Sequence, residues 1–285
     1  MVHDGTDIID KEYKNLCAEM YAKGHSFFTY ISDSADSLAS CCRLRNEVAE
    51  NTFSPTSGLT GVKTGSCNVI SLNMNRIVQD CYRQWVGVDA LSSVKHPCLG
   101  NTRFFDNLKV YLTNILERVY KYLIAYKTML YDWEDRGMYA SSNGGYINIK
   151  DLFSTVGING LNEAAEFLGL TVSNNPDYIK FLQLILGTIK EQNKIHSIHD
   201  KKRPFLFNCE VVPAEGLGVK NYQWDKEDGY IVPEDRNLYN SYFYNAHDNT
   251  SVLDKFILHG RQTYQYTDGG FPPVLYLFIL SNGYE

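Results

Sequence analysis

The sequence predicts an α/β fold with a largely parallel sheet, because long amphipathic helices alternate with short apolar runs. Apolar residues recur in steps of three and four over residues 107–133 and again over residues 176–189, which places one apolar stripe along each expected helix. Apolar runs rich in β-branched or aromatic residues cover residues 68–73 and 205–212. Strands that are separated by long helices are typical of parallel sheets.

Both expected helices have terminal signals in the sequence. Asp106 is placed to cap the start of the first helix, and Gly137 follows its end. Asn175 is a capping residue before the second helix, and Pro176 occupies its first turn. The two apolar stripes therefore begin where helices are expected to begin.

Composition and charge narrow the class of protein. A chain of 285 residues allows one large domain or two smaller ones. Hydrophobic residues make up 44% and charged residues 21%, which is close to the globular norm and excludes wholesale disorder and fibrous folds. The 27 basic and 33 acidic side chains give a net charge of −6, and a nucleic-acid surface needs clustered Lys and Arg. We expect no nucleic-acid partner.

Cysteine usage and hydropathy indicate a cytoplasmic protein. The seven cysteines are too few for a disulfide scaffold and none lies in a C-x-x-C motif, which fits a reducing compartment. The N-terminus lacks the apolar segment of a signal peptide. The most apolar run, residues 271–280, is well short of the roughly 20 residues of a membrane-spanning helix. We expect no membrane partner.

The adjacent pair Cys41 and Cys42 is the first candidate for chemistry. Neighbouring cysteines cannot easily form a disulfide without straining the peptide between them. One interpretation is two buried packing thiols. The other is a redox or radical thiol, with Arg43 and Arg45 supplying positive charge beside it. The residues alone leave both interpretations open.

Two glycine-bearing segments are candidate anion sites. Residues 155–163 are expected to form a turn that leads into a helix at 161–168, and free N–H groups at a helix start bind anions. Residues 213–221 are expected to form a Gly-rich loop after a strand, with Lys220 adding charge. The second segment lacks the spacing of a Walker loop. Glycines before helices are also common for structural reasons alone.

The histidines give no metal signal. His196 and His199 lie three residues apart near a helix end, without an acidic or cysteine partner at ligand spacing. We expect both to be exposed helix residues, and we expect no metal site in the chain.

Four segments together resemble the anaerobic, class III ribonucleoside-triphosphate reductases, which are glycyl-radical enzymes. The segments are residues 34–44 with the cysteine pair, 64–73, 145–170 and 207–270. The resemblance implies part of the ten-stranded α/β barrel of the glycyl-radical and ribonucleotide reductase superfamily, with a central finger loop. Residues 1–270 would then be a partial catalytic barrel domain whose finger loop covers about residues 36–65. Residues 271–285 depart from the family pattern and are interpreted as a divergent apolar tail left by truncation or read-through.

The resemblance also implies roles for individual residues. Cys42 would carry the thiyl radical, with Cys41 as its packed neighbour and less favoured alternative. The substrate would be a ribonucleoside triphosphate. Its expected binding residues are Ser66, Asn68, Asn159, Gly160, Pro213, Ala214, Glu215, Gly216, Leu217 and Gly218.

The same resemblance implies cofactors and partners outside this chain. The glycyl radical and a zinc site would lie in a missing C-terminal part, and elements that bind ATP or dNTP effectors in a missing N-terminal part. A radical-SAM activating enzyme would supply S-adenosylmethionine chemistry from an iron–sulfur cluster. The complete enzyme would be a homodimer that uses formate or a thiol protein as reductant. We therefore expect the isolated chain to be inactive.

The sequence leaves two other functions open. A glycyl-radical acyltransferase similar to pyruvate formate-lyase shares the barrel and also uses adjacent cysteines. A non-catalytic remnant, or a subunit that complements other chains, is the alternative from another class. The reductase-type sequences at residues 155–169 and 213–221 favour a nucleotide substrate.

Overall fold

The computed structural model describes residues 10–23, 65–87, 102–212, 215–240 and 242–245, together with residues 254–255, 257–258 and six short strands before residue 61. The short strands form three two-stranded pairs. They are β1 (Val2–His3) parallel to β2 (Tyr30–Ile31), β3 (Ser37–Ala39) antiparallel to β4 (Arg45–Glu47), and β5 (Thr52–Ser54) antiparallel to β6 (Gly58–Thr60).

A three-stranded parallel sheet forms the centre of the described chain. It consists of β7 (Ser66–Asn73), β8 (Phe153–Asn159) and β9 (Leu206–Val211), in the order β7-β8-β9. Asn73 pairs with Asn159, so the first two strands end side by side. This sheet confirms the predicted α/β class and both predicted strands. The ten-stranded barrel is not shown by these three strands.

The middle strand corrects one sequence prediction, because residues 155–159 lie in β8 and not in a turn. Gly157 is a strand residue that allows close packing. A Cβ added to it would lie 2.5 Å from Cγ2 of Val212 and 2.7 Å from Oγ of Ser71. Only Gly160, with φ of 75°, makes the left-handed turn before the next helix. The two glycines of this motif therefore have different roles.

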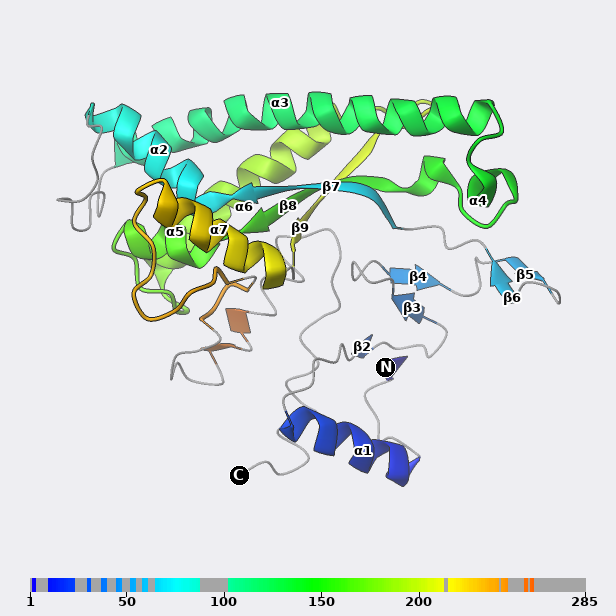
Figure 1. The fold of residues 1–285 in the computed structure, drawn as a ribbon, viewed down its shortest axis with the longest axis horizontal. Helices are drawn as coiled ribbons and strands as arrows, with labels where there is room; N and C mark the ends of the chain where they lie inside the picture. The colour runs from blue at the N-terminus through cyan, green and yellow to red at the C-terminus, as the bar shows by residue number, and fades with distance from the viewer. Residues whose placement is uncertain are drawn as a thin grey trace.

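Two long helices cover one face of the sheet. Helix α3 (Thr102–Asp135) packs on β7 and β8, and α6 (Pro176–His196) packs on β9 and on α3 (Figure 1). The core between the sheet and these two helices is apolar, because alternate residues of each strand point toward the helices. Its fully buried members include Val156, Ile158, Leu108, Leu112, Leu116, Leu182, Ile185 and Ile189.

The helix ends partly confirm the predicted signals. The side chain of Asn175 accepts hydrogen bonds from the backbone N–H groups of Asp177 and Tyr178, so it caps α6 as expected. Gly137, with φ of 71°, follows the end of α3. Asp106 lies inside α3, which already includes Thr102, so the predicted cap is wrong. The apolar stripe simply extends further than the segment from which the cap was inferred.

Three helices start directly at the carboxyl ends of the strands. They are α2 (Met74–Val86), α5 (Leu161–Phe167) and α7 (Glu215–Glu227), and α2 packs against α5. Helix α7 corrects the predicted Gly-rich loop at residues 213–221, since residues from Glu215 onward are helical. Other helices among the described residues include α1 (Lys11–Ala22), α4 (Ala140–Asn143) and the 3-10 turn η2 (Ile149–Asp151).

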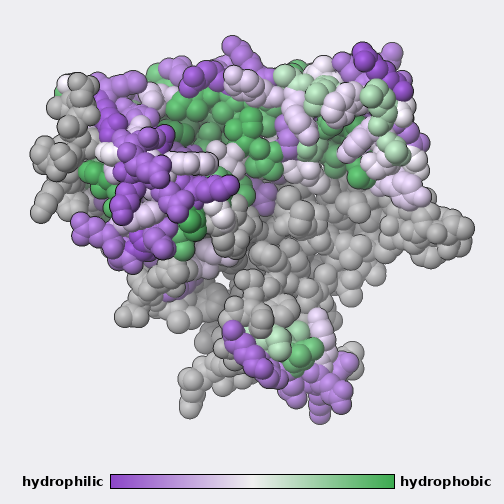
Figure 2. Space-filling view, in the orientation of Figure 1, coloured by the Kyte–Doolittle hydropathy of each residue, from purple (hydrophilic) through white to green (hydrophobic). Residues whose placement is uncertain are grey.

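Several expectations lie outside the described residues. The proposed finger loop at residues 36–65 is described only for strands β3 to β6 and Gly65, and the apolar tail at residues 271–285 is not described. The described helices include none that is long and apolar enough to cross a membrane. In the space-filling view, the surface over α7 is mainly hydrophilic (Figure 2).

Candidate functional site

The candidate site lies where the three parallel strands end. Ligands of open α/β sheets bind outside the carboxyl ends of the strands. Here Asn73 ends β7, Asn159 ends β8 and Val211 ends β9, and a helix follows each of them closely. The first N–H groups of a helix have no partner within the helix, so such an edge collects hydrogen-bond donors.

Asn159 links its strand to two other segments of the chain. Its Oδ1 atom accepts a hydrogen bond of 2.9 Å from Nδ2 of Asn221 in α7. Its Nδ2 atom donates to the backbone oxygen of Asn240 at 3.5 Å, and the N–H of Gly160 donates to the same oxygen at 3.4 Å. The Asn159 side chain is buried. The end of β8 is therefore held in a fixed orientation.

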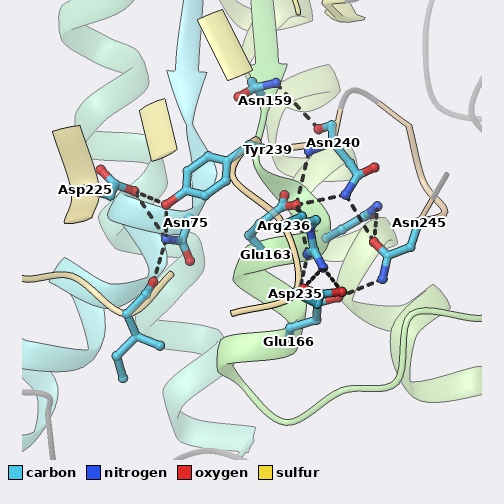
Figure 3. A network of polar contacts seen from close by, with 12 residues as sticks. Asn75, Asn159, Glu163, Glu166, Asp225, Asp235, Arg236, Tyr239, Asn240 and Asn245 are labelled. Carbon is cyan, nitrogen blue, oxygen red and sulfur yellow. Dashed lines mark hydrogen bonds and ion pairs between the residues drawn. The ribbon is translucent and has the colours of Figure 1, made fainter. Parts of the chain in front are cut away.

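Asp225 of α7 is a buried acceptor for donors from three segments. Its Oδ1 atom accepts from Nδ2 of Asn73 at 2.9 Å and from Nε of Arg76 at 2.7 Å. Its Oδ2 atom accepts from Nδ2 of Asn75 at 3.2 Å and from the hydroxyl of Tyr239 at 2.7 Å (Figure 3). Because the carboxylate side chain is fully buried, these donors replace its lost hydration.

The Tyr239 hydroxyl remains a donor at all ordinary pH values. Burial raises the pKa of Tyr239 far above its usual value, and the adjacent Asp225 carboxylate raises it further. The tyrosine therefore stays protonated, and its hydroxyl donates a hydrogen bond to Asp225. This bond fixes residue 239 against α7.

Glu163 of α5 forms a second buried ionic cluster. Its Oε1 atom accepts from Nε and Nη2 of Arg236 at 3.1 and 3.0 Å, and from the backbone N and Nδ2 of Asn240 at 3.1 and 2.9 Å (Figure 3). Glu166 also contacts Nη2 of Arg236, at 2.5 Å. Burial raises the pKa of Glu163, and the positive charge of Arg236 opposes this shift. The cluster fastens residues 236–240 to α5.

The structure brings several of the predicted binding residues to one corner. Asn159 and Gly160 contact Asn240, while Gly218 contacts the neighbouring Tyr239. A Cβ added to Gly218 would lie 2.6 Å from the Tyr239 oxygen, and the Tyr239 N–H donates to the Gly218 oxygen at 3.2 Å. The first turn of α7, which also holds Glu215, Gly216 and Leu217, thus lies near the end of β8. Gly216 faces open space.

Ser66 and Asn68 lie at the opposite end of the sheet. Ser66 starts β7 and pairs with Phe153, and a strand rises about 3.3 Å per residue, so the seven steps to Asn73 span roughly 23 Å. The Ser66 hydroxyl instead forms a hydrogen bond of 2.7 Å with Oγ1 of Thr155. Thr155 in turn donates to Asn208 Oδ1 at 2.7 Å. These residues form a polar row across the three strands.

The predicted radical site lies outside the described residues. Cys41 and Cys42 are not described, and neither are Pro213 and Ala214. None of the described cysteines, Cys17, Cys67, Cys81 and Cys209, is in a disulfide bond.

The two histidines differ from their predicted environment. His196 ends α6 and is half-buried, with its ring stacked on Tyr120 at a centroid distance of 4.2 Å. Its Nε2 atom lies 3.4 Å from Glu117. His199 is exposed but lies beyond the helix. The prediction of two exposed helix residues is wrong because His196 packs against α3.

Comparison with known proteins identifies the family. A family model described as anaerobic ribonucleoside-triphosphate reductase matches residues 1–282. The chain belongs to this family. No curated protein matches the chain.

Solved structures of anaerobic ribonucleotide reductases share the fold of this family member. The enzyme from Thermotoga maritima with glycerol in the active site is 21% identical, with a TM-score of 0.61, over 94% of this chain and 40% of that one. Its complex with dATP and CTP is 19% identical, with a TM-score of 0.63, over 98% and 44% of the two chains. A third structure, an anaerobic ribonucleotide reductase, is 21% identical over 85% and 35%, with a TM-score of 0.59. The chain thus spans about two fifths of the length of these relatives.

Sequence reasoning did not find the buried charges of this reductase-family site. All five residues of the two clusters lie inside segments 145–170 and 207–270, which carried the resemblance, so their position could have marked them. Asp225, Arg236 and Tyr239 have no recognisable motif of their own within those segments. Their partners are distant in the chain, and only folding brings the pairs together.

The described residues do not fit a metal centre. Within these parts of the chain, no group of three or more His, Cys, Asp or Glu side chains could hold a metal ion. The zinc that the sequence resemblance implies therefore has no set of ligands among the described residues.

Proposed function

We propose that this chain carries the catalytic centre for anaerobic reduction of ribonucleoside triphosphates to deoxyribonucleoside triphosphates. The observation that supports this most strongly is the reductase family model, which matches residues 1–282. The chain spans two fifths of its relatives' length, so the reaction is proposed for an assembly that includes the remaining parts. The product would supply DNA synthesis.

Cys42 is proposed as the residue that reacts with the ribose. The glycyl radical that family membership implies would supply the unpaired electron, and Cys42 would give up its thiol hydrogen atom to become the thiyl. The Cys42 thiyl then takes the 3′ hydrogen of the ribose, and the 2′ hydroxyl leaves as water. Formate, oxidised to carbon dioxide, or a dithiol, oxidised to a disulfide, would supply two electrons. Together with two protons they give C2′ its new hydrogen and let the 2′ hydroxyl leave as water. The Cys42 thiol would then return a hydrogen atom to C3′ and become the thiyl again. A barrel interior that excludes water would protect these radicals.

The triphosphate is proposed to lie between the end of β8 and the first turn of α7. Free N–H groups at the start of a helix favour anions. Gly216 leaves space in this turn, and Gly160 and Asn159 lie at the end of the adjacent strand. The sheet-edge location agrees with the general rule for α/β folds. One relative was solved with dATP and CTP, which are both triphosphates.

We propose the regulatory and activating partners on the basis of the same family membership. A T. maritima relative holds dATP in its specificity site, so we propose dNTP or ATP effectors for the complete enzyme. We also propose a radical-SAM activating enzyme, a homodimeric assembly and a cytoplasmic location. Pyruvate formate-lyase-like acyl transfer is less well supported, because the matching family model describes a reductase.

Formation of dCTP from CTP under anaerobic conditions tests the proposal. The chain is combined with the family regions that it does not span, an activating enzyme, S-adenosylmethionine, and formate or a dithiol. We expect dCTP only when the activating enzyme is present. Acetyl transfer to coenzyme A in place of dCTP would support the acyltransferase. A fully activated assembly that binds CTP without reducing it would support a non-catalytic role.

A further inference from the structure

Residues 235–240 contact both elements that are proposed to hold the triphosphate. At one end of β8, the Asn240 oxygen accepts hydrogen bonds from the Gly160 N–H and from Asn159. At α7, the Tyr239 backbone lies against Gly218, where no side chain would fit. The distance between the strand end and the first turn of α7 therefore depends on where residues 239 and 240 lie.

Glu163 holds this segment by two of its residues. One buried oxygen, Oε1, accepts two donors from Arg236 and two from Asn240, at distances between 2.9 and 3.1 Å. Both the backbone N–H and the side-chain amide of Asn240 are used in this way. The side chains of Glu163 and Arg236 are 0% and 5% exposed, so water does not compete for these bonds.

We propose that Glu163 is a positioning residue for triphosphate binding: through Asn240, it sets the orientation of the Asn159–Gly160 corner relative to the first turn of α7. This inference rests on the proposed function. Glu163 itself does not contact the triphosphate. Its effect reaches the ligand because a shift of the Tyr239 backbone, which lies against Gly218, would move the first turn of α7, whose N–H groups are proposed to face the phosphate oxygens.

Glu166 provides a matched control for this role. Its carboxylate also pairs with Arg236, but its other oxygen accepts from Asn245 instead of Asn240. Replacing Glu166 therefore weakens the Arg236 ion pair without removing a bond to Asn240. A role for the cluster in stability alone predicts that both glutamates matter in the same way.

The test measures dissociation constants of the 285-residue chain for tripolyphosphate and for CTP by calorimetry, with urea unfolding measured in parallel. We expect Glu163→Gln to weaken both ligands about tenfold, as expected for a loss near 1.4 kcal/mol. We expect Glu166→Gln to bind like the wild type. In the assembled enzyme, Glu163→Gln should raise KM for CTP with little change in kcat.

A second variant keeps the test decisive if Glu163→Gln does not fold. Asn240→Ala removes the side-chain bond to Glu163 and keeps the backbone one, so a smaller loss of affinity is expected. Unchanged affinity in the folded Glu163→Gln or Asn240→Ala chain would overturn the positioning role and leave the proposed function standing. Absence of binding of both ligands by the wild-type chain within the assembled enzyme would overturn both.

Discussion

Two carboxylates that contact the same arginine should differ greatly in importance. Arg76 pairs with Asp225 at 2.7 Å through Nε and with Asp228 at 2.6 Å through Nη2. The Asp225 side chain is 0% exposed and accepts four hydrogen bonds, whereas the Asp228 side chain is 56% exposed. The substitutions Asp225→Asn and Asp228→Asn each replace a carboxylate partner of Arg76 with a neutral amide, one at a buried position and one at an exposed position.

The expected magnitudes follow from this difference in burial. Asn at position 225 removes the charge and places an amide donor among the donors of Asn73, Asn75, Arg76 and Tyr239. Breaking a buried ion pair costs about 3–5 kcal/mol. An exposed pair is worth about 0–1 kcal/mol, because water solvates both charges when they separate.

Urea unfolding of the 285-residue chain measures both free energies of unfolding. The m-value shows whether each variant keeps the same change in exposed surface. We expect Asp225→Asn to lose several times more stability than Asp228→Asn. Similar losses for the two variants, within about 0.5 kcal/mol, would refute the argument that Asp225 organises the buried network around α7.

Two further predictions concern a pair of glycines, one buried and one exposed, and a buried lysine. Gly157→Ala should destabilise the chain by about 1–3 kcal/mol through overpacking against Val212 and Ser71. Gly187→Ala in α6, where nothing lies within 4 Å of the added Cβ, should stabilise the chain by up to about 1 kcal/mol. Urea midpoints that shift in the same direction in both glycine variants would contradict these two predictions. Burial lowers the pKa of Lys127, whose Nζ donates to the Leu152 oxygen at 2.5 Å, so the unfolded chain binds this proton more tightly than the folded chain. The free energy of unfolding of the wild type, relative to that of Lys127→Met, should therefore rise from pH 7 to pH 10, a range that lies below the ordinary lysine pKa of 10.5. A constant difference between the two chains across that range would contradict a lowered pKa for Lys127.

Local sequence patterns predicted the elements that bury an apolar stripe. Helices α3 and α6 follow from periodicity and strands β7 and β9 from short apolar runs, because the apolar residues of all four face one core. Strand β8 was missed since Gly157 and Gly160 together suggest a turn, although Gly157 is needed for close packing within the sheet. The first turn of α7 was missed for the same reason, because its glycines suggest a loop.

The candidate site could be predicted only in part. The family resemblance pointed to Asn159 and Gly160, and the structure places Asn159 against α7 and Gly160 at the start of α5. The residues that hold this corner were not predictable from spacing, since Asn73 and Asp225 are 152 positions apart and Glu163 and Asn240 are 77 apart. Such bonds depend on tertiary packing, which no local pattern encodes.

The most direct measurement of the central claim compares Cys42→Ser with Cys41→Ser in the anaerobic dCTP assay. A serine O–H bond is too strong to exchange a hydrogen atom as the thiol does, whereas serine is close to cysteine in size. The account predicts no dCTP from Cys42→Ser and substantial dCTP from Cys41→Ser, with CTP affinity unchanged in both variants. Turnover by Cys42→Ser together with an inactive Cys41→Ser would assign the radical to the other cysteine. Turnover by both variants would contradict thiyl chemistry at this pair.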